Sequence, residues 1–171
     1  MGEIIVVDGI KIPIGSHEGK TLVIGSDHRG FEYKNAIINY LEGDFVLIDV
    51  GTSSPERCDY PAISENIGSE IERDPYHTAG IGICGSGIGI IIPASKHNRV
   101  YGATCSTPEK AANSRRHNNT NLVGIGADEV DLETALDIVN SFLKTPFYSN
   151  EVDERTYLNR YIQTVAFENI K

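Results

Sequence analysis

Residues 81–94 combine the residue types that could do chemistry in this chain. An apolar run typical of a strand ends in Cys84, a glycine-rich turn over residues 85–89 follows, and a second apolar run can start a helix. In a strand–turn–helix layout, backbone N–H groups can point at an anion and the helix dipole helps to hold it. Open α/β sheets bind their ligands at the carboxyl ends of strands. The pattern therefore predicts a site in which a thiol lies beside an anion-stabilising loop.

Two further polar clusters could contribute to such a site. Residues 27–30 (Asp-His-Arg-Gly) follow an apolar strand pattern, and His117 lies in the dense polar run of residues 114–121. Each cluster also has a structural interpretation. Asp27 could cap a helix while His28 is exposed, and residues 114–117 could be a solvated helix end whose cations favour the helix dipole. Residue types alone leave both interpretations open.

The other cysteines and histidines carry weaker signals. Cys58 and Cys105 are interpreted as small hydrophobic residues, which is also the alternative for Cys84. His17, His77 and His97 are expected at the surface, and no His/Cys/Asp spacing is typical of a metal site.

A glycine pattern over residues 80–85 fits GxGxxG but only weakly indicates dinucleotide binding. It lies largely inside the predicted strand, whereas a dinucleotide fold needs it after a strand, with an acidic residue about 20 positions on.

Composition limits the class of protein. The chain has 171 residues, 40% hydrophobic and 23% charged, which predicts one domain with a substantial core. A net charge of −9 argues against a nucleic-acid-binding surface. The odd number of cysteines, three, favours a reducing compartment over a disulfide framework. Neither a signal peptide nor an apolar run of about 20 residues is recognisable in the sequence. We therefore expect a cytoplasmic protein with no membrane contact.

The elements expected to position these residues alternate along the chain. Asp8-Gly9 between two apolar runs predicts a hairpin over residues 3–14, with a polar linker at 16–20. Five strands are expected at residues 21–25, 45–50, 80–84, 100–104 and 122–125. Helices are expected at residues 31–41, 62–71, from 88, 107–117, 132–142 and 150–170.

This alternation predicts an α/β protein, namely a three-layer α/β/α sandwich with a five-stranded, Rossmann-like parallel sheet. An N-terminal hairpin extension (residues 1–20) precedes the main domain (21–171), which ends in a long helix.

Four segments together resemble the ribose-5-phosphate isomerase B / galactose-6-phosphate isomerase family. They are residues 25–30, 59–61, 84–89 and 114–121, which occur in the family's order and spacing. The resemblance implies aldose–ketose isomerisation of a sugar phosphate through a cis-enediolate, without metal or other cofactor. It also implies a homo-oligomer, dimer or tetramer, with active sites at the subunit interface.

The resemblance further implies a role for each matching residue. Cys84, as thiolate, would move the proton between C1 and C2, and His117 would open the sugar ring. The enediolate oxygen would be held by the Ser86 hydroxyl and by the backbone of Gly85, Gly87, Ile88 and Gly89. Sugar hydroxyls and the phosphate would be bound by Asp27, Asn118, Tyr60 and His28, and the phosphate also by C-terminal arginines of a neighbouring subunit.

Two departures from the family pattern concern the phosphate. The family has two arginines four positions apart near the C-terminus, whereas Arg155 and Arg160 are five apart and Asn159 could occupy one of the places. Asp128 stands where an arginine is usual, and an acid there would repel phosphate.

Several functions therefore stay open. The leading hypothesis is isomerisation of ribose 5-phosphate to ribulose 5-phosphate, with allose or galactose 6-phosphate as alternative substrates. A phosphosugar-binding protein without catalysis is a second hypothesis, and a flavodoxin-like nucleotide or flavin carrier, expected from architecture alone, is a third.

Overall fold

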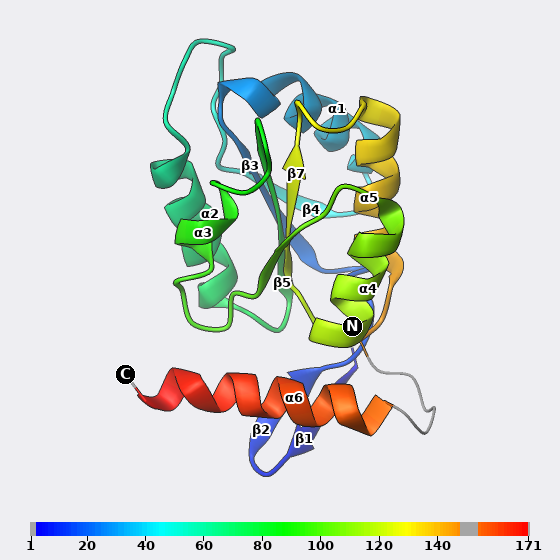
Figure 1. Ribbon diagram of the computed structural model, residues 1–171. Coiled ribbons are helices and arrows are strands. Elements are labelled where there is room, and N and C mark those ends of the chain that lie inside the picture. Colours follow the sequence, from blue (N-terminus) through cyan, green and yellow to red (C-terminus); the bar gives the residue numbers. More distant parts are fainter. Residues whose placement is uncertain (1–2, 148–153, 171) are drawn as a thin grey trace.

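A computed structural model describes residues 3–147 and 154–170, and it shows a five-stranded parallel sheet between layers of helices (Figure 1). The strands lie in the order β4-β3-β5-β7-β6, and every neighbouring pair is parallel. Their bounds are Thr21–Ser26 (β3), Val46–Asp49 (β4), Thr78–Cys84 (β5), Gly102–Thr104 (β6) and Leu122–Gly126 (β7). The predicted three-layer α/β architecture is confirmed.

Alternating side chains of the strands build one apolar core on each face of the sheet. Leu22 and Ile24 of β3 pack with α1 (Phe31–Leu41) and α5 (Leu132–Lys144). Val23, between them, packs on the opposite face with α2 (Tyr60–Arg73) and α3 (Ile91–Ala94). The central strand β5 is buried along its whole length, as expected for a strand covered on both faces.

Local capping signals set the ends of α4 (Pro108–Asn118). The Thr107 side chain accepts a hydrogen bond from the Lys110 amide at 3.2 Å, and Pro108 occupies the first turn, where its missing N–H is not needed. Asn119 ends the helix in the left-handed conformation, with φ of 52°. The helix thus delivers His117 in its last turn, close to the predicted boundary.

The prediction that a helix begins at residue 88 is wrong. Residues 85–90 form turns, and of this segment only the single turn α3 (Ile91–Ala94) is helical, closed by a hydrogen bond from the Ser95 amide to the Ile91 carbonyl at 2.9 Å. Glycines at 85, 87 and 89 disfavour helix, because glycine loses the most backbone entropy there. A single turn has few aligned peptide dipoles, so the loop's own N–H groups must supply most of any anion stabilisation.

The hairpin and the last helix pack on each other beyond the amino ends of the sheet strands (Figure 1). Strands β1 (Ile4–Val7) and β2 (Ile10–Pro13) are antiparallel, as predicted. Ile12 and Ile14 join Phe147, Tyr161 and Val165 in a third buried cluster. Helix α6 spans Glu154–Ala166 and a 3-10 turn follows at Phe167–Ile170, while positions 150–153 of the predicted helix lie outside the described residues.

The expectation that His17 lies at the surface is wrong, because His17 is buried, and Lys20 in the same linker is buried as well. His17 donates from Nε2 to the Thr120 carbonyl at 3.2 Å, and its ring packs against Phe142 with centroids 4.9 Å apart. These partners are more than 100 positions away in the sequence, so the linker's polarity did not reveal them. His77 is exposed, as predicted.

Burial of His17 predicts a loss of stability in acid. Burial and the charge of Arg115 hold the pKa of His17 well below 6.5. Below that pH the unfolded chain binds a proton that the native chain does not, so the free energy of unfolding falls as the pH falls, by up to about 1.4 kcal/mol per pH unit. Urea unfolding at neutral pH and about two units lower should show a steeper loss for wild type than for His17→Gln.

The exposed His77 supplies the matched control for this prediction. His77→Gln should retain the wild-type dependence on pH, because the His77 side chain is exposed and its replacement leaves the buried His17 in place. Equal pH dependence in wild type and His17→Gln would contradict a neutral, buried His17.

Candidate active site

Cys84 is the last residue of β5, and the loop of residues 85–90 passes over the end of β7. Cys84 is buried, with 4% of its surface exposed. Gly87 has a φ of +71°, and a Cβ there would lie 2.7 Å from the Gly126 amide nitrogen. The Thr104 hydroxyl donates to the Gly87 carbonyl at 2.9 Å. Backbone conformation and close approach therefore both require glycine at position 87 and fix the loop beside the thiol.

Several backbone donors of this loop have no partner. Among the hydrogen bonds of the described residues, the amides of Ser86, Gly87 and Gly89 make none, while the Ile88 amide donates to Ser86 Oγ at 3.3 Å. Backbone N–H groups need partners, and unpaired ones beside a reactive group can bind an oxyanion. The loop thus offers donors next to the Cys84 thiol.

Asp27 and His28 lie at the end of the neighbouring strand β3, where the 3-10 turn η1 (His28–Gly30) begins. Asp27 Oδ1 accepts hydrogen bonds from the amides of Arg29 at 2.9 Å and Gly30 at 3.3 Å, so Asp27 caps this turn. His28 Nδ1 lies 3.2 Å from the Cys58 carbonyl oxygen and accepts from the Cys58 amide at 3.4 Å. Capping uses one Asp27 oxygen and leaves the other for a ligand.

Tyr60 opens α2 and borders the loop at Gly89. A Cβ on Gly89 would lie 2.7 Å from Tyr60 Cζ, so the ring lies directly against this glycine. Ile88 and Ile92 beside it are 55% and 57% exposed. We call the group around the thiol the Cys84 half-site: Asp27, His28, Tyr60, Cys84 and residues 85–89.

His117 and Asn118 lie elsewhere, in a pocket of about 430 Å³ between α4, α6 and the edge strand β6. The His117 ring stacks on Tyr157 of α6, with centroids 4.4 Å apart and 16° between the planes. The guanidinium of Arg160, which also lines the pocket, lies 5.8 Å from the centre of the same Tyr157 ring. Arg155 is in α6, and its side chain lies outside the described residues. We call His117, Asn118, Tyr157 and Arg160 the His117 half-site.

One chain does not bring the two half-sites together. Cys84 pairs with Gly126 at the carboxyl end of β7, whereas His117 precedes Leu122 at the amino end of that strand. Four residue steps at about 3.3 Å each place the two ends of β7 about 13 Å apart. The cysteine and histidine that the sequence resemblance assigns to one reaction therefore lie at opposite edges of the sheet.

Sequence reasoning did not identify two features of these half-sites. Tyr157 is three positions before Arg160, a spacing that places both on one face of a helix, but nothing in the sequence indicates its stack on His117. Asp128, expected to repel phosphate, forms an ion pair with Arg29 at 2.5 Å between nitrogen and oxygen.

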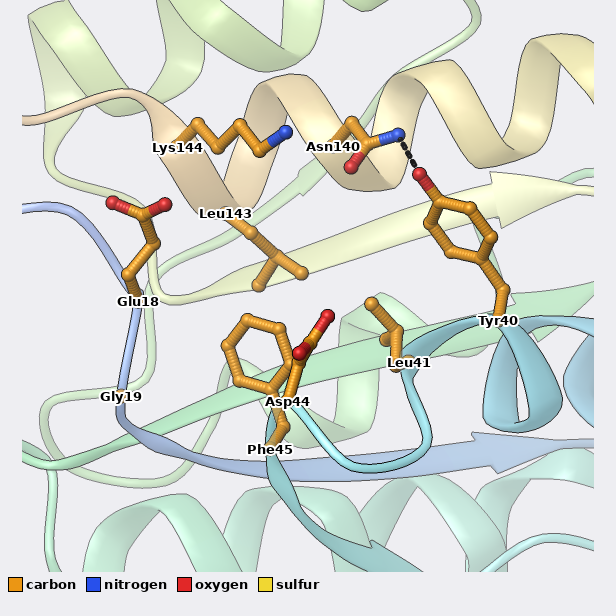
Figure 2. A pocket seen from close by; sticks show the side chains of 9 residues that line it. All are labelled: Glu18, Gly19, Tyr40, Leu41, Asp44, Phe45, Asn140, Leu143 and Lys144. Carbon is orange, nitrogen blue, oxygen red and sulfur yellow. Dashed lines mark hydrogen bonds between the residues drawn. The ribbon is translucent and has the colours of Figure 1, made fainter.

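A separate pocket of about 440 Å³ lies between the ends of α1 and α5 (Figure 2). Its polar lining includes Glu18, Asp44 and Lys144, and the Asn140 amide donates to the Tyr40 hydroxyl at 2.6 Å. It shares no residue with either half-site. Within the described residues, no group of three His, Cys, Asp or Glu side chains could hold a metal ion. No helix in residues 3–147 or 154–170 is long and apolar enough to cross a membrane.

Comparisons with known proteins agree with this architecture. The family described as Ribose/Galactose Isomerase matches residues 22–158. Ribose-5-phosphate isomerase B of Escherichia coli is 37% identical over 137 residues, covering 80% of this chain and 91% of the relative. D-erythrulose-4-phosphate isomerase of Pectobacterium atrosepticum is 30% identical over 129 residues, covering 74% and 84%.

A solved structure extends the likeness to three dimensions. Ribose-5-phosphate isomerase B from Mycoplasma genitalium with bound ribulose-5-phosphate superimposes with a TM-score of 0.81 at 26% sequence identity, covering 88% of this chain and 97% of that one. The residues matched by the family include Cys84, His117 and the carboxyl ends of β3 and β5, where the Cys84 half-site lies. This chain therefore belongs to the ribose/galactose isomerase family and is an aldose–ketose isomerase of the sugar-phosphate type.

Proposed function

We propose that the chain interconverts ribose 5-phosphate and ribulose 5-phosphate through a cis-enediolate, with Cys84 as the base. The observation that carries this proposal is the Cys84 thiol at the end of β5 beside the unpaired amides of Ser86, Gly87 and Gly89. The relatives named for ribose 5-phosphate support the choice of substrate.

The chemistry needs one mobile proton and a stabilised oxygen. The Cys84 thiolate removes the proton from C2 of the open-chain aldose, and the electron pair forms the C1–C2 double bond of the enediolate. The loop amides and the Ser86 hydroxyl bind the negatively charged oxygen, which lowers the barrier to this step. The thiol then returns the proton to C1, and the C2 hydroxyl proton moves to O1, which gives the ketose and restores the thiolate.

A second copy of the chain supplies the other half of the site in this proposal. Cys84 and His117 lie at opposite edges of one sheet, so His117 of one copy must meet the Cys84 half-site of another. Exposed Ile88 in the loop and exposed Ile92 in α3 provide apolar surface that a second copy would bury. A symmetric dimer would then form two equivalent composite sites.

The remaining roles follow from this arrangement. His117, oriented by its stack on Tyr157, transfers the protons that open the sugar ring. The second oxygen of Asp27, the Tyr60 hydroxyl and Asn118 bind sugar hydroxyls, and His28 contacts the phosphate. Arg160 and Arg155 of the second copy reach the same phosphate from α6.

A direct assay tests the proposal. Purified protein is given ribose 5-phosphate, erythrulose 4-phosphate, and allose and galactose 6-phosphates, with Cys84→Ala as the blank. We expect Cys84-dependent turnover that is fastest with ribose 5-phosphate. Faster turnover of another sugar phosphate would contradict ribose 5-phosphate as the substrate. Binding without any turnover would contradict the proposed reaction.

A further inference from the structure

We propose that Arg29, positioned by Asp128, is the phosphate-binding cation of the Cys84 half-site. This inference rests on the proposed function, because it assumes that a sugar phosphate reacts at Cys84. It assigns the substrate's phosphate to a residue outside the set that the sequence resemblance supplies, and it gives Asp128 a role other than repulsion.

The ion pair lies directly over the loop that follows Cys84. Arg29 Nη2 donates to Asp128 Oδ1 at 2.5 Å, joining the segments after β3 and β7, which are 99 positions apart in the sequence. The Asp128 amide donates to the Gly85 carbonyl at 3.0 Å. A Cβ on Gly85 would lie 2.7 Å from Asp128 Oδ2 and 3.9 Å from Arg29 Cγ. The pair is therefore next to the residue that follows the thiol.

Arg29 retains donors for a ligand. A guanidinium has five N–H donors, and among the described residues the Arg29 side chain makes one hydrogen bond, to Asp128. The Arg29 side chain is 54% exposed, so its other donors are accessible. His28, its neighbour in η1, directs Nδ1 at the Cys58 backbone. Arg29 is thus available for the phosphate of a substrate bound at the Cys84 half-site.

Charge makes such a cation necessary. The chain carries a net charge of −9, and Asp27 and Asp128 both lie close to the loop. A phosphate dianion would be repelled by these carboxylates unless a cation compensated them locally. Contact with Arg29 neutralises Asp128, and the same contact restricts the arginine side chain before substrate binds. Preorganisation of this kind reduces the entropy lost on binding.

Substitution of Arg29 tests the contact. Arg29→Ala should raise KM for the phosphorylated substrate by about 10- to 100-fold, which is the effect expected for loss of a charge-assisted hydrogen bond to phosphate. The value of kcat should change much less, and Arg29→Lys should recover part of the loss. Arg73→Ala is the matched control, because Arg73 is also exposed and ion-paired, to Glu70 at 2.8 Å, but lies at the far end of α2.

A double-mutant cycle tests the positioning role of Asp128. With Arg29 present, Asp128→Asn should leave KM unchanged or raise it, because Arg29 loses its orienting partner. In the Arg29→Ala background, the same change should lower KM, because an unpaired carboxylate is removed. An equal decrease of KM in both backgrounds would show that Asp128 simply repels phosphate and would overturn its positioning role.

Binding of inorganic phosphate, followed by calorimetry, separates this inference from the proposed function. Arg29-dependent phosphate binding in a protein that isomerises none of the sugars would support the cation site and reject the reaction. Normal isomerisation, with no larger change of KM or phosphate affinity in Arg29→Ala than in Arg73→Ala, would overturn the role of Arg29.

Discussion

Cys84→Ala is expected to lower kcat with ribose 5-phosphate by roughly 100- to 10,000-fold, the usual contribution of a positioned acid or base. The thiol ends β5 beside the unpaired amides of the loop, so its removal leaves the oxyanion donors but no group to move the proton. Because the change removes one buried sulfur atom, the fold should persist and KM should change much less than kcat.

Cys105→Ala provides the matched control for this variant. Cys105 is also buried, with 2% of its surface exposed, and burial raises the pKa of its thiol, which disfavours the reactive thiolate. Steady-state kinetics should show near-normal kcat for this control. A Cys84→Ala enzyme that retained more than about a tenth of wild-type kcat would exclude Cys84 as the base.

Arg115→Met is expected to reduce the free energy of unfolding by roughly 3–5 kcal/mol, the range for breaking a buried charged network. Arg115 is fully buried and donates to the carbonyls of Thr120 at 2.6 Å, Gly15 at 3.0 Å and Thr145 at 3.2 Å. It also donates to Asn119 Oδ1 at 2.9 Å. Removing the guanidinium leaves several buried acceptors without donors.

The neighbouring Arg116 is the control for this prediction. Its side chain is exposed and bonds only to Asn113 among the described residues, so Arg116→Met should change stability by less than about 1 kcal/mol. Urea unfolding of both variants measures the difference. Similar midpoints for the two variants would show that the linker and the end of α4 do not depend on Arg115.

Local sequence signals predicted most of the fold. Apolar runs such as residues 80–84 identified buried strands, Asp8-Gly9 identified the hairpin, and Thr107-Pro108 identified the start of α4. Each signal acts within a few residues of where it appears. Alternation of strands and helices then determined a parallel sheet, because parallel strands need crossover connections.

Contacts between distant segments were not predictable in the same way. Burial of His17 depends on Thr120 and Phe142, and the ion pair of Arg29 depends on Asp128. The sequence did hold one unused signal. His117 precedes a predicted strand whereas Cys84 ends one, and residues at opposite ends of parallel strands lie at opposite edges of the sheet.

The measurement that tests the account most directly is the activity of a mixed oligomer. Cys84→Ala and His117→Ala chains carry different affinity tags, are expressed together, and the assembly that contains both is purified through both tags. Each variant assembled with itself should be nearly inactive. A composite site predicts that a mixed dimer has one intact site and therefore about half of the wild-type activity. A mixed assembly as inactive as its parents would contradict a site shared between two copies.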